Sequence, residues 1–492
     1  MSTIARIAKN TVALAAGNMI TKVLSLVFLV YVARKLGDIG FGRFSIAMAL
    51  VGLISVLPNY VARPYIIRET ARDRRGTGRI LDQVTLTNIV LSLLTLTGLA
   101  LVAPHLGYHQ EAVTAILILG FALIFDSVTN SYHSALIGFE RMELSALINV
   151  VNSLLTVSLG FIVLLFGMGL LPLIVAYAVA KATTLIFAHR VLWRIEVRTW
   201  IGFDPQLMWR MLSGAWPFFF TTVFVIIYQR LDTVMLSFFR GEQEVGYYNA
   251  AYKLMEAIGL LTASFVAAVY PVLSRLFVDA PDRLILVYQR AMRYLLAFVV
   301  PASAGVTIVA RDLMPSLFGS TFVAGSTALI ILVWGQSLDC LNPLLSQTLR
   351  AVDRERTVAW ITGFGALANI LFNLLLIPTF GLIGAAIATL LCFGLVLATQ
   401  QRFLKRAIGE VSLVVPLVRT IIASAAMSAG LLLLSRYFLA EWSAGRRTVV
   451  VVLAGAVIYL PLAVLFGVFD QSDRKFFADF VRSRWAHKRA AT

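Results

Sequence analysis

Five cationic side chains lie inside stretches of sequence that are otherwise apolar enough for lipid: Lys22, Arg63, Lys181, Arg230 and Lys253. A charge at the depth of a bilayer costs at least ~2.5–3.5 kcal/mol on insertion scales, so such residues usually face a polar interior that has a function. Lys22 lies near the centre of its apolar run, from which an ammonium group cannot easily reach water. The pattern predicts a polar cavity within the membrane that receives an anionic ligand.

The other four cations each have a plainer structural explanation. Arg63 and Lys181 lie about one to two helical turns from the inner ends of their apolar runs, so both could act as interfacial anchors. Arg230 could pair with a carboxylate on a neighbouring helix. Lys253 precedes Glu256 by three residues, a spacing that permits an ion pair along one helix.

Four acidic residues lie in the same apolar runs: Asp126, Asp232, Glu256 and Asp339. Burial in a membrane favours the neutral form of a carboxyl group, so any of them could take up a proton, or bind a sodium ion, to couple transport to a gradient. Pairing between helices is the alternative, and we favour it. His105 and His109 lack a third ligand in the sequence, so no metal site is predicted.

The composition is that of a membrane protein that crosses the bilayer many times. Of 492 residues, 59% are hydrophobic and 14% are charged, whereas soluble domains carry about 25% charged residues. The net charge of +17 is spread in short clusters between apolar runs, which indicates membrane orientation and argues against nucleic acid as a partner. Two cysteines predict neither a disulfide framework nor a metal centre, and without a P-loop motif no ATP hydrolysis is expected.

Apolar runs of about 20 residues, the length that crosses a ~30 Å hydrocarbon core, predict fourteen helical spans. Strands are excluded because open sheet edges are not satisfied in lipid. The first run is too long for a signal peptide and should remain as a span. The spans are 11–33, 43–67, 80–103, 111–137, 145–166, 170–189, 212–238, 246–272, 287–310, 323–348, 357–377, 382–401, 416–437 and 448–469.

The distribution of basic residues predicts that both termini are cytoplasmic. Of the 42 Lys and Arg residues, 29 fall in connections on the side of the N-terminus and 8 on the opposite side. No connection exceeds about 25 residues, so the sequence leaves no room for a soluble catalytic domain. The basic tail 470–492 carries aromatic residues at helical spacing and predicts an amphipathic helix on the inner leaflet.

The chain contains an internal duplication. A set of four residues, Gly37, Gly42, Phe44 and Ala47, recurs 204 positions on as Gly241, Gly246, Tyr248 and Ala251. Asp126 recurs 213 positions on as Asp339. We therefore expect six-helix bundles over residues 1–205 and 206–412, then two additional helices over 413–469. Because six spans separate the copies, the bundles should be related by an axis along the membrane normal, with the cavity between them.

Two motifs resemble a known family. The first is Arg230-Leu-Asp-Thr-Val-Met-Leu236, followed by Val245-Gly-Tyr-Tyr248 and Ala250-Ala-Tyr-Lys-Leu254; the second is Ile377-Pro-Thr-Phe-Gly-Leu-Ile-Gly-Ala-Ala-Ile-Ala388. Both are similar to signatures of the polysaccharide transporters within the multidrug/oligosaccharidyl-lipid/polysaccharide exporter superfamily, which includes the O-antigen and lipid II flippases. The similarity extends over nearly the whole chain.

The resemblance implies a flippase in the bacterial inner membrane. Such proteins carry undecaprenyl-diphosphate-linked oligosaccharide from the cytoplasmic to the periplasmic leaflet by alternating access, for surface polysaccharide biosynthesis. In that family, spans 1, 2, 7 and 8 line a cationic cavity, and here Lys22, Arg63, Arg230 and Lys253 occupy those spans, one in each. The expected partners are the lipid-linked glycan, membrane lipids and a polysaccharide polymerase or export machinery; we expect a monomer with no cofactor.

Asparagines in the spans offer a further set of polar contacts. They could bind sugar hydroxyl groups, although hydrogen bonding between helices is the favoured role for most of them. The residues are Asn18, Asn88, Asn130, Asn149, Asn152, Asn369 and Asn373.

Two other functions remain open. An ion-coupled antiporter of drugs or small molecules from the same superfamily would favour a cavity dominated by acids and aromatics. A membrane-embedded glycan polymerase, ligase or acyltransferase would need a large outer loop or a catalytic cluster at the interface, and the longest outer loops here have about ten residues.

Overall fold

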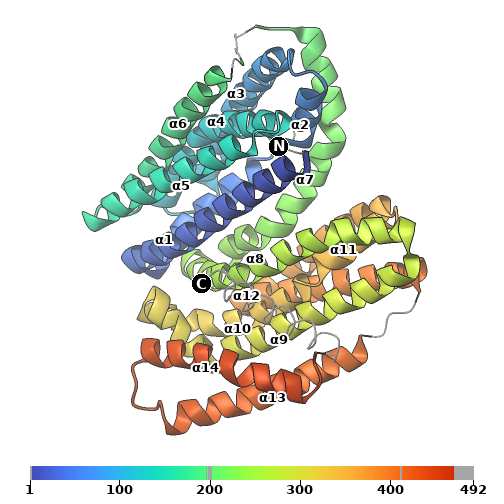
Figure 1. Ribbon diagram of the computed structural model, residues 1–492. Coiled ribbons are helices and arrows are strands. Elements are labelled where there is room, and N and C mark those ends of the chain that lie inside the picture. The colour runs from blue at the N-terminus through green and yellow to red at the C-terminus, as the bar shows by residue number, and fades with distance from the viewer. Residues whose placement is uncertain (1–2, 62, 196, 198–201, 410–412, 470–492) are drawn as a thin grey trace, which may run out of the picture. The chain divides into compact units, whose positions relative to one another are not determined.

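The structure, a computed structural model, describes residues 3–61, 63–195, 197, 202–409 and 413–469 (Figure 1). Every regular element in these ranges is a helix. Eleven helical segments among them are long and apolar enough to cross a membrane. The prediction of an all-α membrane protein is therefore confirmed. The tail 470–492, for which an amphipathic helix is predicted, lies outside the described residues.

The helices follow the predicted spans closely. The first six are α1 (Thr3–Ile54), α2 (Arg63–Arg72), α3 (Thr77–Val102), α4 (Gln110–Gly138), α5 (Met142–Leu165) and α6 (Leu170–Arg194). The next six are α7 (Pro205–Arg240), α8 (Glu242–Asp279), α9 (Pro281–Phe318), α10 (Ser326–Asp339), α11 (Asn342–Ala351) and α12 (Glu355–Ile408). The last two are α13 (Val414–Tyr437) and α14 (Ala444–Leu465).

Two of these helices each contain two predicted spans. Helix α1 turns at Gly37, which has φ 70° and ψ −177°. Helix α12 turns at Gly381, which has φ 58° and ψ −133°. Only glycine adopts such backbone angles readily, so each turn falls where the sequence places one. Counted on either side of these turns, with α10 and α11 as one crossing and α2 taken with the second half of α1, the helices agree with the fourteen predicted.

The second predicted span, over residues 43–67, is interrupted in the structure. Helix α1 ends at Ile54, and α2 begins only at Arg63. Pro58 has no N–H to continue the helical hydrogen bonds. Two side chains bond the carbonyl groups left at the break: Ser55 Oγ donates to the oxygen of Gly52 at 2.7 Å, and Asn59 Nδ2 donates to that of Ser55 at 2.8 Å.

By its packing, the chain divides into two compact units, of which unit 1 comprises residues 1–250 and 362–385. Helix α4 is its central element and contacts α1, α2, α3, α5 and α6 (Figure 1). Buried side chains of α2 to α7 form the core, among them Leu81, Val84, Tyr132, Leu136 and Ile148. Because α4 is surrounded, several polar side chains along it are buried, among them Ser127, Ser131 and Ser134.

Unit 2 comprises residues 251–361 and 386–492. Buried side chains of α9, α11 and α12 form one core, including Met292, Val299 and Leu344. Helices α13 and α14 pack on α9 through a second core. The Nε atom of Arg447 on α14 lies 2.7 Å from the carboxylate of Asp312 on α9, which ties these helices together at one end.

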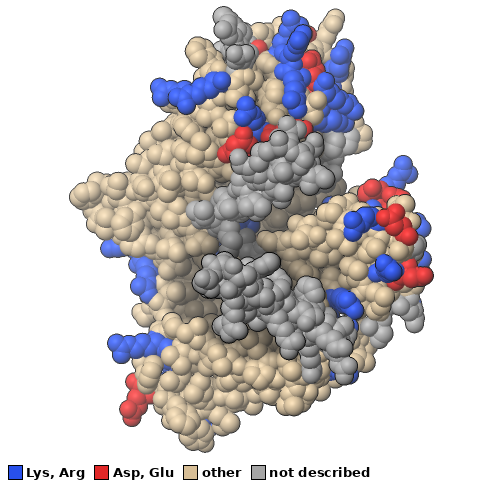
Figure 2. All heavy atoms as spheres, viewed as in Figure 1, with Lys and Arg blue, Asp and Glu red and all other residues tan. Residues whose placement is uncertain are grey.

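The surface of unit 1 agrees with a position in lipid. Over α5 and α6 the surface is nearly free of charge in Figure 2, and large apolar side chains such as Phe161 and Phe166 are exposed there. Basic side chains gather at the end that carries α2 and the beginnings of α3 and α7 (Figure 2). Apolar flanks between charged ends are typical of a protein that spans a membrane many times.

The two repeated glycine turns, at Gly37 and Gly241, both lie in unit 1 and have similar backbone conformations. Gly241, 204 positions after Gly37, has φ 83° and ψ −173°, close to the angles of Gly37. The repeated sequence therefore produces the same left-handed turn between successive helices.

The two turns contact each other reciprocally through a second pair of glycines. Gly42 packs against the carbonyl oxygen of Glu242, and Gly246 packs against that of Asp38. Asp38 and Glu242 are themselves 204 positions apart. Each copy thus presents the same residues to the other, as at an isologous interface around a local two-fold axis.

We predict that Gly246→Ala destabilises the protein. An added Cβ would overlap the Asp38 carbonyl oxygen, and because both partners are backbone atoms the turns would have to separate. Overpacking of this kind costs about 1–3 kcal/mol. The midpoint of thermal unfolding in detergent should fall. Gly98→Ala, on α3 with open space around it, is the matched control and should not lower the midpoint. Equal midpoints for both variants would contradict the tight contact.

Candidate functional site

A polar pocket lies inside unit 1, with a volume of about 290 Å³. The α1–α2 connection, α2, α4, α5 and α7 each contribute to its wall, and nine of its twelve lining residues have polar side chains. Among the described residues that line it, Arg63 is the only Lys or Arg, and none is an Asp or Glu. Hydrophilic walls inside an apolar bundle are costly, so they indicate a hydrophilic ligand.

Arg63 reaches this pocket from the first residue of α2. The break at residues 55–61 positions it, because α2 starts anew there with Pro64 in its first turn, where the missing N–H costs nothing. Its side chain is exposed and forms no ion pair with a described residue. A guanidinium group without a carboxylate partner is available to an anionic ligand.

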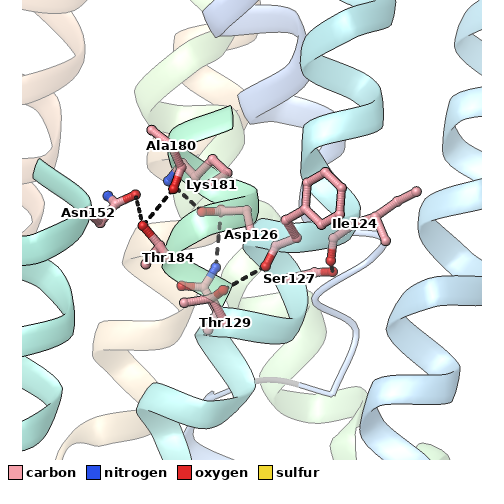
Figure 3. Close-up of polar contacts among 10 residues, drawn as sticks. Ile124, Asp126, Ser127, Thr129, Asn152, Ala180, Lys181 and Thr184 are labelled. Carbon is pink, nitrogen blue, oxygen red and sulfur yellow. Dashed lines mark hydrogen bonds and ion pairs between the residues drawn. The ribbon is translucent and has the colours of Figure 1, made fainter. Parts of the chain in front are cut away.

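An ion pair between α4 and α6 lies close to the pocket. Lys181 Nζ is 2.6 Å from Asp126 Oδ1, and the two side chains point toward each other in Figure 3. Asn130 lines the pocket one helical turn after Asp126, and its Nδ2 donates to Asp126 Oδ2 at 3.3 Å. On the same side of α6, Thr184 Oγ1 donates to Asn152 Oδ1 at 3.4 Å. The aspartate therefore joins two helices and holds the Asn130 amide.

Further polar contacts continue along α4. His133 Nδ1 lies 2.9 Å from Ser145 Oγ on α5. Asn88 on α3 donates through Nδ2 to Ser131 Oγ and to the carbonyl oxygen of Ser127, both at 3.0 Å. Residues spaced three or four apart share one side of a helix, so these groups form a polar seam inside the bundle.

The remaining predicted cations are distributed over both units. Lys22 is exposed on α1, and Arg230 is half-buried on α7, with its Nε close to Gly52 of α1. Neither forms an ion pair with a described residue. Lys253 belongs to unit 2, where its Nζ lies 2.6 Å from Glu256 Oε2. A cavity shared by all four cations remains a prediction.

Two of the predicted acids have no Lys or Arg within ion-pair distance among the described residues. Asp232 is buried; Tyr248 Oη donates to its Oδ2 at 2.5 Å and the Thr233 N–H to its Oδ1 at 2.7 Å, across the α7–α8 hairpin. Asp339, at the end of α10, receives a long hydrogen bond of 3.5 Å from Asn342 Nδ2. Asp126 and Asp339 are equivalent in the duplication, yet their surroundings differ.

A charged cluster around the duplicated turns was not predicted. We call it the turn cluster: Asp38, Arg43, Glu111, Glu242 and Tyr247. Arg43 lies 2.6 Å from Glu111 and 2.7 Å from Glu242, and Tyr247 Oη donates to Asp38 at 2.8 Å. Partial burial raises the pKa of the Asp38 carboxyl, but hydrogen bonds from Gln243 and Tyr247 outweigh this effect and hold the pKa below its ordinary value. The sequence signal for this cluster was that Asp38 and Glu242, like the repeated glycines, are 204 positions apart.

Comparison with known proteins assigns the chain to a family. The family model described as "Polysaccharide biosynthesis protein" matches residues 7–277, more than half of the chain, and a second model, MatE, matches residues 217–375. A "Probable low-salt glycan biosynthesis flippase" of Haloferax volcanii is 22% identical over 79% of this chain and 81% of its own length. A Shigella dysenteriae protein named "Putative O-antigen transporter" is 26% identical over 74% and 91%, respectively.

The fold is also found among solved structures. The lipid II flippase MurJ in its inward closed conformation superposes with a TM-score of 0.75 at 16% identity, over 93% of this chain and 99% of that one. This similarity confirms the predicted superfamily fold. Together with the family-model match over residues 7–277, it shows that the chain is a multi-pass membrane protein of the polysaccharide biosynthesis protein family.

Proposed function

We propose that this protein is a flippase that moves undecaprenyl-diphosphate-linked oligosaccharide across the bacterial cytoplasmic membrane. The observation that carries the proposal is Arg63, a guanidinium group without an ion-pair partner among the described residues, in a polar pocket within an apolar bundle. The names of its relatives support the same substrate class. We propose a transporter and not an enzyme, with both termini cytoplasmic.

The diphosphate binds, in this proposal, to the cations Lys22, Arg63, Arg230 and Lys253. A diphosphate carries at least two negative charges, which Arg grips through paired hydrogen bonds and Lys attracts as a point charge. Lys253 already contacts Glu256, so its ammonium group would exchange one anionic partner for another. The lipid tail stays in the bilayer while the headgroup crosses, which avoids enclosing the whole molecule.

Alternating access requires that contacts at one end of the cavity break during each cycle. The turn cluster lies between spans on the side opposite the basic connections, which is the periplasmic side if the termini are cytoplasmic. We propose that it closes that side until the headgroup is loaded. The repeated turns suit this role, because each copy contacts the other through small reciprocal surfaces that can separate as a unit.

A second candidate function is ion-coupled antiport of small molecules. The match of the MatE model to residues 217–375 favours it. Uptake of cationic dyes into vesicles separates the two functions: a flippase with a cationic site should not transport such dyes, since like charges repel.

We predict that Lys22→Ala and Arg230→Ala each block glycan export while the protein remains inserted and abundant. Loss of one cation removes a charge-assisted contact to the diphosphate, and Arg230→Lys should retain part of the activity because the charge remains. The measurement is accumulation of the lipid-linked intermediate on the inner leaflet. Lys35→Ala, an exposed lysine beyond the predicted span of the same helix, is the control and should export normally. Full export by both alanine variants would remove the cationic-site proposal.

We further predict different roles for the two equivalent aspartates. Lys181→Ala leaves the Asp126 carboxylate without its partner, at a cost of about 1–3 kcal/mol or more, and should lower the unfolding midpoint. Exchanging the charges, with Asp126→Lys and Lys181→Asp together, should restore most of that loss and keep transport. The pair would then be structural.

Asp339 is the better candidate for ion coupling because no basic side chain among the described residues neutralises it. Asp339→Asn should leave stability nearly unchanged but make transport insensitive to a collapsed proton or sodium gradient. Normal gradient dependence in this variant, or its loss in the Asp126/Lys181 exchange, would reverse the assignment.

A further inference from the structure

The pocket around Arg63 is richer in amides and hydroxyls than a diphosphate site requires. Asparagines approach it from three separate segments: Asn59 from the α1–α2 connection, Asn130 from α4 and Asn149 from α5. Phosphate is an acceptor of hydrogen bonds and is usually met by cations and N–H donors. Side-chain amides both donate and accept, which suits a ligand whose groups do the same.

Part of this hydrogen-bonding capacity is unused. Among the described residues, the Asn149 amide has no hydrogen-bond partner. Asn59 and Asn130 each commit Nδ2 to the protein, to Ser55 and Asp126, which leaves their Oδ1 atoms to accept. His133 uses Nδ1 toward Ser145, so its Nε2 is also open. Asn130 is exposed and Asn59 and Asn149 are only partly buried, so these free donor and acceptor atoms are accessible to a ligand that enters the pocket.

The size and charge of the pocket further limit the kinds of ligand that it could bind. Its volume of about 290 Å³ is at the lower end of the ~300–1,000 Å³ typical of small-ligand pockets, enough for one sugar ring but not for a chain of them. Among the lining residues that the structure describes, one guanidinium and no carboxylate favour a ligand with a single anionic group. His133 is the only aromatic residue in this described part of the wall, which argues against a flat apolar cation as the ligand.

We infer that this pocket is a subsite for one glycosyl phosphate unit. Arg63 binds the phosphate oxygens, and Asn59, Asn130 and Asn149 bind hydroxyl groups of the attached sugar. The inference rests on the proposed function, since a diphosphate-linked glycan places its first sugar directly beside phosphate. The Asp126–Lys181 ion pair positions the Asn130 amide, because Asp126 accepts the hydrogen bond that fixes it.

The test is binding to the purified full chain in nanodiscs, measured by calorimetry. The probes are glucose 1-phosphate, galactose 1-phosphate and N-acetylglucosamine 1-phosphate, with inorganic phosphate and methyl glucoside as comparisons. At least one sugar phosphate should bind about tenfold more tightly than inorganic phosphate, the effect of one or two additional hydrogen bonds. If none does, the pocket is not a glycosyl phosphate site.

Variants separate the sugar contacts from the phosphate contact. Asn149→Ala should weaken sugar phosphate binding about tenfold and leave inorganic phosphate unaffected, whereas Arg63→Gln should weaken both. Asn152→Ala is the matched control: it lies one turn away on the same helix, its amide accepts from Thr184, and it does not line the pocket. Asn152→Ala should change neither affinity. Equal losses in the Asn149 and Asn152 variants would show a structural effect and overturn the inference.

Export assays distinguish failure of this inference from failure of the proposed function. If Asn149→Ala binds and exports like the unaltered protein while Lys22→Ala blocks export, the sugar subsite is wrong and the flippase proposal stands. If Lys22→Ala and Arg230→Ala export normally while the Asn149 variant loses sugar phosphate binding, the pocket is a glycosyl phosphate site in a protein of another function.

Discussion

A charged group within a hydrocarbon layer must be stabilised by the protein, by water or by a ligand, and this constraint organises unit 1. Lys181 meets it by an ion pair with Asp126 across α4 and α6. Arg43, at the turns between spans, is also paired, with Glu111 and Glu242. Arg63 has no such partner among the described residues and faces a pocket instead. The first two solutions hold helices together, whereas the third leaves binding capacity for something that is not part of the chain.

Residues that correspond in the predicted duplication keep one conformation in the turns but have different surroundings elsewhere. The glycine turns keep one conformation in both copies, because the positive φ of Gly37 and Gly241 is required wherever two spans connect so tightly. The two carboxylates, Asp126 and Asp339, differ in their partners. Asp126 pairs with Lys181, but the position that corresponds to Lys181, 213 residues later, is Gly394. Asp339 therefore lacks the cation that neutralises its counterpart. The turns fix the fold, and the side chains between them are free to specialise.

Hydropathy predicted most helices within a few residues, since the membrane thickness fixes how long an apolar run must be. Hydropathy does not register the break after Ile54, where Pro58 interrupts the helix and Ser55 and Asn59 bond the carbonyl groups beside it. In the sequence, Lys181 lies near the end of an apolar run, which favoured the interpretation that it anchors its helix at the membrane interface. Its contact with Asp126, 55 residues away, depends on the rotation of α4 against α6, and one sequence does not supply that register. The turn cluster escaped prediction for the same reason.

The fold alone does not separate a glycan flippase from a drug antiporter. The solved structures that share this fold have sequence identities to this chain too low to indicate its substrate. The sign of the charge in the pocket is more informative. A site for organic cations gains from carboxylates and aromatic faces, whereas the described residues around Arg63 in the pocket wall include neither an Asp nor a Glu. The nearest seam carboxylate, Asp126, is already neutralised by Lys181 and turned toward Asn130. The ion pair thus keeps negative charge out of the pocket while orienting an amide into its wall, an arrangement that favours an anionic, hydroxyl-bearing ligand.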